Sequence, residues 1–240
     1  MCLAIEERVV SCIIWSDVDL EDETAIAGAL GDMLRRSDEL QGAINRRLEE
    51  AKFDGSLRGA AVFGMCNVTF EHAAGLRLLI AGGCFTPAFA LMRLQFEAVT
   101  RAMWLLYVAP DSAVEKMSAP LSLENEQAAK NLPSVSEMVE QIRKGVGTRV
   151  PVAAWEMLDR FKDLNWRSLN SFVHGGIHAL RRHRDGYPVK LILDVIRNSN
   201  ALSTMAGMTM ALLTDQETAQ TMGRIQPEFA DCLPELLSGP

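Results

Sequence analysis

The sequence is poor in aromatic residues, and this shortage bears on the class of fold. Phe, Trp and Tyr together make up 6% of its 240 residues, and only two residues are tyrosines. Ala, Leu and Met are plentiful, and these residues favour helix, whereas aromatic and β-branched residues favour strand. No segment has a clear strand pattern. We therefore expect an all-α protein.

Paired cysteine motifs are also lacking. No two cysteines have the C-x-x-C spacing, and their number is odd: Cys2, Cys12, Cys66, Cys84 and Cys232. This pattern is typical of reduced thiols that fill a core, and it argues against a disulfide framework or a zinc site.

No long apolar run is free of charge. Residues 5–15 are apolar, but Glu6 and Glu7 precede the core of this run and no cleavage-like segment follows, which argues against a signal peptide. A second run, residues 85–109, contains three charged residues, which are too many for a membrane span. We expect a cytoplasmic protein that does not enter a membrane.

An overall excess of positive charge is missing as well. The formal net charge of −7 argues against a protein that coats nucleic acid by bulk electrostatics. The charge is unevenly distributed, however. Residues 1–54 hold thirteen Asp or Glu against six Lys or Arg, whereas residues 160–197 hold eight Lys or Arg against three Asp. A polyanion would therefore bind to the second region.

Helical periodicity organises the chain as one helical domain over residues 1–240. We expect an up-down helical bundle with extra N-terminal helices and an irregular mid-chain insertion. Its parts, in order, are acidic N-terminal helices, either separate or fused into one (1–54), long core helices (57–108), the insertion (110–150), further helices (152–214) and a C-terminal tail (215–240).

Glycine and proline mark the boundaries within these parts. Gly82-Gly83 ends the first core helix, and Pro188 starts the last long helix. In the insertion, residues 111–118 and 134–144 have the pattern of short helices. Asp19 or Asp22 is expected to cap the first N-terminal helix. Asn165 is expected to cap a helix that begins at Trp166.

Three charged residues in the second core helix are spaced four apart: Arg93, Glu97 and Arg101. In a helix they stack on one face as a ladder. One interpretation is a partly buried ion network that fixes helix packing, since buried charges must be paired. The other is that the arginines face a cleft, because one carboxylate between two guanidiniums leaves a positive charge.

The stretch 166–184 concentrates polar, reactive side chains and holds three of the four histidines. If its first half is helical, one face carries Arg167, Asn170, Ser171 and His174, at i, i+3, i+4 and i+7. We expect Gly175-Gly176 to end or bend this helix. The positive residues beyond it, Arg181, Arg182 and Arg184, are expected in a loop.

Three kinds of chemistry could use the residues of this face. His174 and His178 have the spacing of two metal ligands on a helix, but glycines separate them and no acidic residue completes a site, so we expect no metal and no cofactor. Ser168 and Ser171 lack the strained turn and the orienting carboxylate of a serine nucleophile. Metal-independent phosphodiester chemistry remains, because a His can transfer protons and an Arg can bind phosphate oxygens.

The pattern Arg167-x6-His174, late in a helical chain and after a helix with Arg-x3-Glu-x3-Arg, resembles the HEPN superfamily and its Arg-x4-6-His motif. The phrase Ser171-Phe172-Val173-His174-Gly175-Gly176, with Phe96-Glu97 upstream, also resembles uncharacterised bacterial HEPN-like proteins. The similarity covers residues 57–214. Catalytic members carry Asn, Asp or His directly after the Arg, whereas this chain has Ser168.

The resemblance implies a helical bundle that dimerises and cleaves RNA without metal, in a toxin–antitoxin or anti-phage system. His174 would be the general acid/base, Arg167 the transition-state clamp and Asn170 an orienting group. Supporting residues would be Arg93, Glu97, Arg101 and Ser171, and the RNA backbone would be bound by Arg181, Arg182 and Arg184. A homodimer and an antitoxin or regulatory protein are the expected partners. The alternative is a non-catalytic helical dimerisation or interaction module.

Overall fold

Helices account for 79% of the chain in the computed structural model, which describes residues 20–49 and 51–235. No strand occurs in these ranges, where Val146 and Val150 form only an isolated bridge. The all-α prediction is therefore confirmed. The apolar run 5–15 and the candidate cap Asp19 lie outside the described residues. In chain order the elements are α2 (Leu20–Leu48), α3 (Leu57–Ala81), α4 (Phe85–Tyr107), α5 (Asp111–Ser118), α6 (Leu123–Ala129), α7 (Val135–Lys144), α8 (Val152–Val173), α9 (Ile177–Asp185), α10 (Val189–Ala211), α11 (Gln216–Gly223), α12 (Ile225–Glu228) and η1 (Ala230–Cys232).

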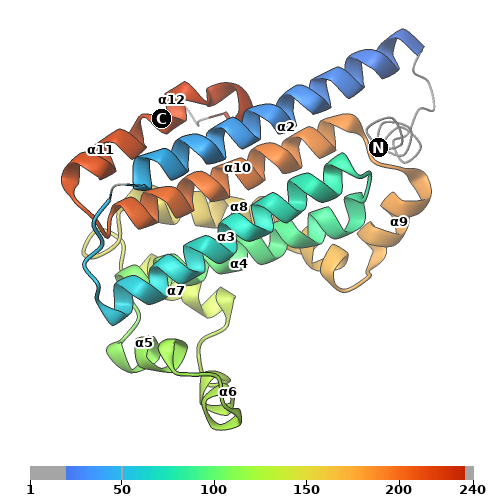
Figure 1. Cartoon of the computed structure of the whole chain (residues 1–240). Helices are drawn as coiled ribbons and strands as arrows, with labels where there is room; N and C mark the ends of the chain where they lie inside the picture. Colours follow the sequence, from blue (N-terminus) through green and yellow to red (C-terminus); the bar gives the residue numbers. More distant parts are fainter. Residues whose placement is uncertain (1–19, 50, 236–240) are drawn as a thin grey trace.

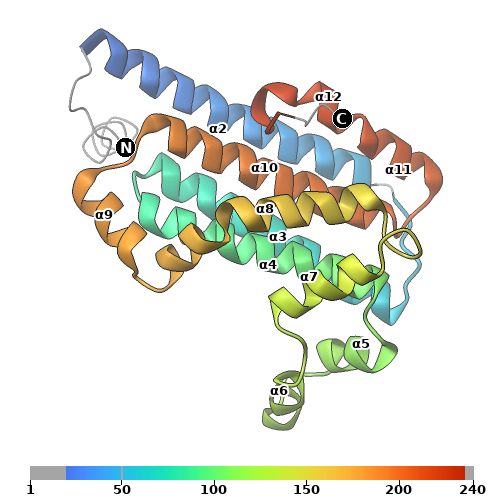
Figure 2. The same cartoon turned by 180° about the vertical axis from the view of Figure 1, so that it is seen from behind.

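The helices α3 and α4 lie side by side along most of their length (Figures 1 and 2). The turn between them is the predicted Gly82-Gly83, where Gly83 has a φ of +72°, a conformation that glycine adopts without strain. Small residues bring the two helices close: a Cβ at Gly75 would lie 3.0 Å from Leu91 Cδ1. This pair forms the base on which the other long helices pack.

α10 packs against α2, α3 and α4, and buried polar bonds fix its position. The Gln95 amide on α4 donates to the Ser199 carbonyl (2.9 Å), and the Asn200 amide donates to Ser37 Oγ on α2 (2.8 Å). Because a buried polar group without a partner is costly, these bonds favour one register between the helices.

α7 and α8 cover another side of α4 (Figure 2). α8 is continuous, so the prediction that Asn165 caps a helix is wrong. The Asn165 amide donates instead to the Phe161 carbonyl one turn earlier (3.0 Å), which is a bond a helix interior permits. The Phe161 ring stacks on Phe96 of α4, with 4.7 Å between ring centroids.

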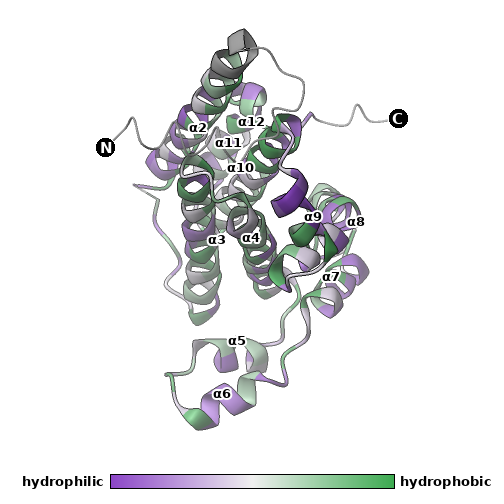
Figure 3. Ribbon diagram, turned by 90° about the vertical axis from the view of Figure 1, so that its right-hand side faces the viewer, coloured by the Kyte–Doolittle hydropathy of each residue, from purple (hydrophilic) through white to green (hydrophobic). Residues whose placement is uncertain are grey.

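The predicted insertion contains three short helices. α5 coincides with the predicted 111–118, and α7 begins after Ser134, whose hydroxyl and backbone form a capping box with Glu137. The helix between them, α6, was not predicted. It lies apart from the bundle (Figures 1 and 3).

The C-terminal segment was expected to be a tail, yet residues 216–232 form α11, α12 and η1. α11, α12 and η1 pack against α2. Arg36 on α2 bonds Asp231 (Nε to Oδ2, 2.8 Å) and the Glu228 carbonyl. Of the two N-terminal arrangements expected, separate helices or one fused helix, the structure has the second, in α2.

A membrane span would need a longer uncharged apolar helix than any that the described part of the chain contains.

Candidate functional site

Arg93 of α4 is the buried centre of the region around the predicted polar face. Its Nε donates to Asn170 Oδ1 of α8 (2.9 Å), and its guanidinium carbon lies 3.5 Å from the centroid of the Trp166 ring. Trp166 in turn meets the Phe96 ring edge-on, at 5.9 Å. These contacts join α8 to α4 within the last two turns of α8. The role of Trp166 was not predicted, although its spacing of four from Asn170 places both on one side of α8.

The predicted Arg93-Glu97-Arg101 ladder is present. Arg93 Nη1 pairs with Glu97 Oε1, and Arg101 Nη1 lies 3.1 Å from Glu97 Oε2. The exposed fraction of the side chain rises along the ladder, from 10% for Arg93 to 32% for Arg101. Burial lowers the pKa of Arg93, while the Glu97 carboxylate opposes this shift. The ladder is therefore a partly buried ion network, and its Arg93 end contacts the polar face through Asn170.

The predicted polar face divides into a buried and an exposed part. Asn170 is half-buried and bonded to Arg93, whereas Arg167 and His174 are both exposed. Among the described residues, neither the Arg167 nor the His174 side chain has a hydrogen-bond or ion-pair partner, and the two do not bond each other. Seven helical positions separate them by about 10 Å along the axis, on the same side of α8. Both side chains are available to a ligand.

The end of α8 lies where the glycines predicted it. Val173 is the last helical residue, His174 is the cap, and Gly175 has a φ of +64°. Ser171 was expected to support the polar face, but its hydroxyl accepts from the His178 backbone N–H (2.9 Å), and its carbonyl accepts from Gly176 N–H (2.7 Å). Ser171 therefore attaches α9 to α8.

The positive residues 181–184 lie in a helix, α9, and the prediction of a loop is wrong. The spacing of Ile177 and Leu180 from Arg181 and Arg184 is helical, and their exposed sides share one face of α9. Asp185 pairs with Arg184 (2.5 Å) and lies 3.8 Å from Arg181, so one carboxylate serves two arginines and positive charge remains. Figure 3 shows part of α9 as strongly hydrophilic, close to α8.

The remaining histidines of the stretch, His178 and His183, are exposed on α9. In the ranges that the structure describes, no three His, Cys, Asp or Glu side chains lie close enough together to hold a metal ion. His72 lies on α3, where burial lowers its pKa despite the neighbouring Glu71.

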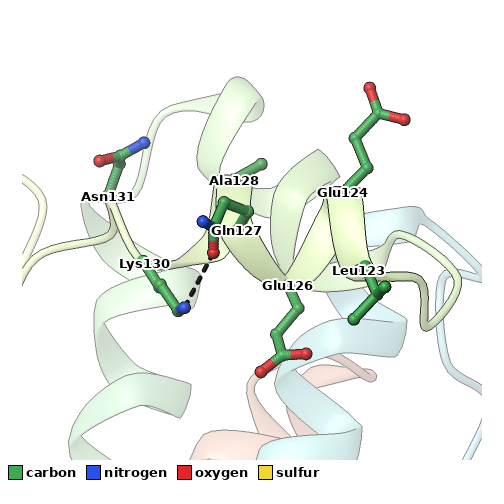
Figure 4. Close-up of a pocket in the computed structure, with 7 residues that line it drawn as sticks. All are labelled: Leu123, Glu124, Glu126, Gln127, Ala128, Lys130 and Asn131. Carbon is green, nitrogen blue, oxygen red and sulfur yellow. Dashed lines mark hydrogen bonds between the residues drawn. The ribbon is translucent and has the colours of Figure 1, made fainter.

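A hollow on the surface of the α6 segment does not coincide with the polar face (Figure 4). The side chains that line it come from α6 and the residues after it: Leu123, Glu124, Glu126, Gln127, Ala128, Lys130 and Asn131. It contains none of the predicted site residues. The carboxylates of Glu124 and Glu126 are the lining groups suited to acid–base chemistry.

Residues 66–235 match the model of a family described as a family of unknown function, DUF6988. The match covers more than half of the chain and includes α4, α8 and α9. The chain belongs to the DUF6988 family. Comparisons with curated proteins and with solved structures found no match.

Proposed function

We propose that the DUF6988 chain is an RNA-binding protein of HEPN type that cleaves RNA without metal as a homodimer. The observation that carries the proposal is the exposure of Arg167 and His174 on one side of α8, above a buried support formed by Asn170 and Arg93. Catalysis at a phosphate needs reactive side chains that are held in place but not already bonded to other protein groups. Arg167 and His174 meet both conditions.

The proposed reaction uses the 2′-hydroxyl of RNA. Its oxygen attacks the adjacent phosphorus and loses a proton to a base, while the bond from phosphorus to the 5′-oxygen breaks and an acid protonates the leaving oxygen. His174 serves as acid or base, and Arg167 stabilises the charge that develops on the phosphate oxygens. One imidazole cannot take both roles in a single step, so His174 of a second copy supplies the other role.

The α9 arginines extend this surface. Arg181 and Arg184 share one carboxylate, and Arg182 has no ion-pair partner among the described residues. Their charge favours binding of the RNA backbone near His174, because phosphate contacts position a nucleic acid without reading its sequence. We place this activity in a toxin–antitoxin or anti-phage system, where a dedicated protein would restrain the nuclease.

A second candidate is a non-catalytic dimerisation or interaction module. It is favoured by apolar side chains exposed on and beside the same face, since Leu164 is 70% exposed and Val173 39% exposed. Exposed apolar residues beside charges are typical of protein contact surfaces.

The decisive experiment incubates purified protein with a fluorescent RNA pool in excess chelator. We expect cleavage by the wild type, and a loss of at least about 100-fold in rate for His174→Ala, the size usual for removal of a general acid or base. Arg167→Ala should lose cleavage by a similar factor. His183→Ala is the matched control, because this exposed histidine lies one helix away and should retain full activity.

The result also separates the two candidates. If the wild type neither cleaves nor binds any RNA in the pool while it remains folded, the RNA proposal is wrong. Binding that His174→Ala leaves unchanged, without cleavage by either protein, would contradict the catalytic role and support a binding module.

A further inference from the structure

Apolar and positive side chains share one face of α9. This α9 patch consists of Ile177, Leu180, Arg181 and Arg184, which follow one another at helical spacing. Its two aliphatic side chains are 67% and 66% exposed, and both arginines are exposed. Ala179, on the other side of the helix, is buried in the core of the bundle. The α9 patch therefore faces away from the bundle and is open to a ligand.

The α9 patch begins close to His174. Two glycines separate His174 from Ile177, so the Cα atoms of these two residues lie at most about 11 Å apart. Ser171 fixes the turn between them, because its hydroxyl accepts from the His178 backbone N–H (2.9 Å) and its carbonyl from the Gly176 N–H (2.7 Å). An RNA whose scissile phosphate lies at His174 can therefore bring a neighbouring nucleotide onto the α9 patch.

Binding of the RNA backbone uses the arginines of the patch but gives its aliphatic side chains no role. Asp185 pairs with Arg184 and lies 3.8 Å from Arg181, so the patch keeps positive charge beside its apolar surface. A nucleotide has the matching parts, a negative phosphate and a base whose flat faces can stack on a side chain. A base offers such a face only where it is unpaired and unstacked, because an RNA duplex presents mainly phosphates and 2′-hydroxyls.

We propose that Ile177 and Leu180 hold the face of an unpaired base next to the scissile phosphate, while the arginines of the patch bind the phosphate of the same nucleotide. This inference rests on the proposed function and adds to it a determinant of specificity. Neither aliphatic side chain can form a hydrogen bond, so the base is held by the apolar area that it buries. A purine buries more area than a pyrimidine, and we therefore expect a purine to be preferred at this position.

The first test removes the base from the RNA and the aliphatic side chains from the protein. The substrate is an RNA that the wild type cleaves, with one cleavable ribonucleotide and 2′-O-methyl groups elsewhere. Each flanking base is replaced in turn by an abasic residue, and at one position we expect the wild type to lose at least about 10-fold in kcat/KM. Ile177→Ser with Leu180→Ser should lose a similar factor on the intact RNA and nothing further on that abasic RNA, since both changes remove the same contact. Leu78→Ser is the matched control, because Leu78 on α3 is 74% exposed and outside the α9 patch.

The second test compares the four bases at the position that the abasic series identifies. The wild type should prefer purines there, and Ile177→Ser with Leu180→Ser should reduce this preference. Affinity for the same RNAs in fully 2′-O-methylated form, measured by fluorescence anisotropy, reports the base contact apart from catalysis, because these RNAs lack the attacking 2′-hydroxyl. Circular dichroism checks that every variant is folded.

The outcomes separate this inference from the proposed cleavage. Tolerance of an abasic residue at every flanking position, equal use of all four bases, or a double variant that keeps the full abasic loss would each overturn the base contact and leave RNA cleavage standing. An abasic loss in affinity without cleavage of any RNA would support the base contact and contradict the catalytic role. A folded wild type that neither binds nor cleaves RNA would overturn both.

Discussion

Arg93 joins an ion network on α4 to the polar face of α8. One edge of its guanidinium pairs with Glu97, its Nε binds Asn170, and its plane covers the Trp166 ring. Such a side chain is stabilised only while its charge remains compensated, because burial already opposes the charged form. The support beneath Arg167 and His174 therefore depends on Glu97, which contacts neither of them.

Replacement of Glu97 by Gln should reveal this dependence. We expect Glu97→Gln to lower the free energy of unfolding by about 3 kcal/mol, since it leaves the Arg93 charge buried without a carboxylate. Arg101→Gln is the matched change at the exposed end of the ladder and should cost less than about 1 kcal/mol. Urea unfolding measures both. Equal costs for the two variants would show that burial does not distinguish the two ends.

At the scale of elements, the junction between α8 and α9 determines where the basic helix lies relative to His174. Gly175 adopts a left-handed conformation there, and Ser171 binds the backbone of Gly176 and His178. A side chain at Gly175 would be strained even though no atom lies within 4 Å of its ideal Cβ position.

Gly175→Ala should therefore destabilise the protein by about 1–2 kcal/mol through backbone strain alone. Gly64→Ala is the control. Gly64 is exposed within α3, has equally open space around its Cβ position, and lacks a positive φ, so alanine should stabilise the helix by about 0.5–1 kcal/mol. Thermal unfolding monitored by circular dichroism compares the two. The same sign for both changes would exclude the conformational explanation.

The elements differ in how well the sequence predicts them. α3 and α4 are long, and the glycines of the turn between them, Gly82-Gly83, mark where one ends and the other begins. Both helices were predicted to within a few residues. Sequence alone predicts a loop where α9 lies. The bond from the His178 backbone N–H to Ser171 Oγ and the burial of Ala179 show how this short helix is held. α6 gave no periodic signal, since it buries no residue.

For the candidate site, the helical placement of the residues was more predictable than their surroundings. Helical spacing correctly grouped Arg167, Asn170 and His174 on α8, and it grouped the three charges of the ladder on α4. Spacing along one helix cannot reveal which residues a second helix covers. The division between bonded Asn170 and exposed His174 depends on how α4 packs against α8, which is a long-range property.

For the molecule as a whole, the C-terminal segment closes the bundle over α2. Arg36 binds both Asp231 and the Glu228 carbonyl, Arg47 binds the Glu228 carboxylate, and the Asn200 amide donates to the Cys232 carbonyl from α10 (2.9 Å). Burial raises the pKa of the Cys232 thiol to about 11, so this cysteine stays protonated near neutrality. Three segments far apart in the sequence thus meet at one place.

The Arg36–Asp231 pair should make this closure dependent on acid. The hydrogen bond from Arg36 lowers the pKa of Asp231 in the folded protein, so its stabilising effect is complete above the ordinary carboxyl range and is lost as the pH falls through the lowered pKa. Because the Asp231 side chain is 60% exposed, Asp231→Asn should cost at most about 1 kcal/mol at neutral pH.

Urea unfolding of the wild type and Asp231→Asn at neutral pH and at about pH 2, below the ordinary carboxyl range, tests this directly, and the difference between them should be much smaller at the lower pH. Asp163→Asn is the control, since Asp163 is exposed on α8 without an ion-pair partner among the described residues and should give no difference at either pH. A difference for Asp231→Asn that persisted unchanged in acid would mean that the side chain acts through packing, because the protonated carboxyl and the amide are then equally uncharged.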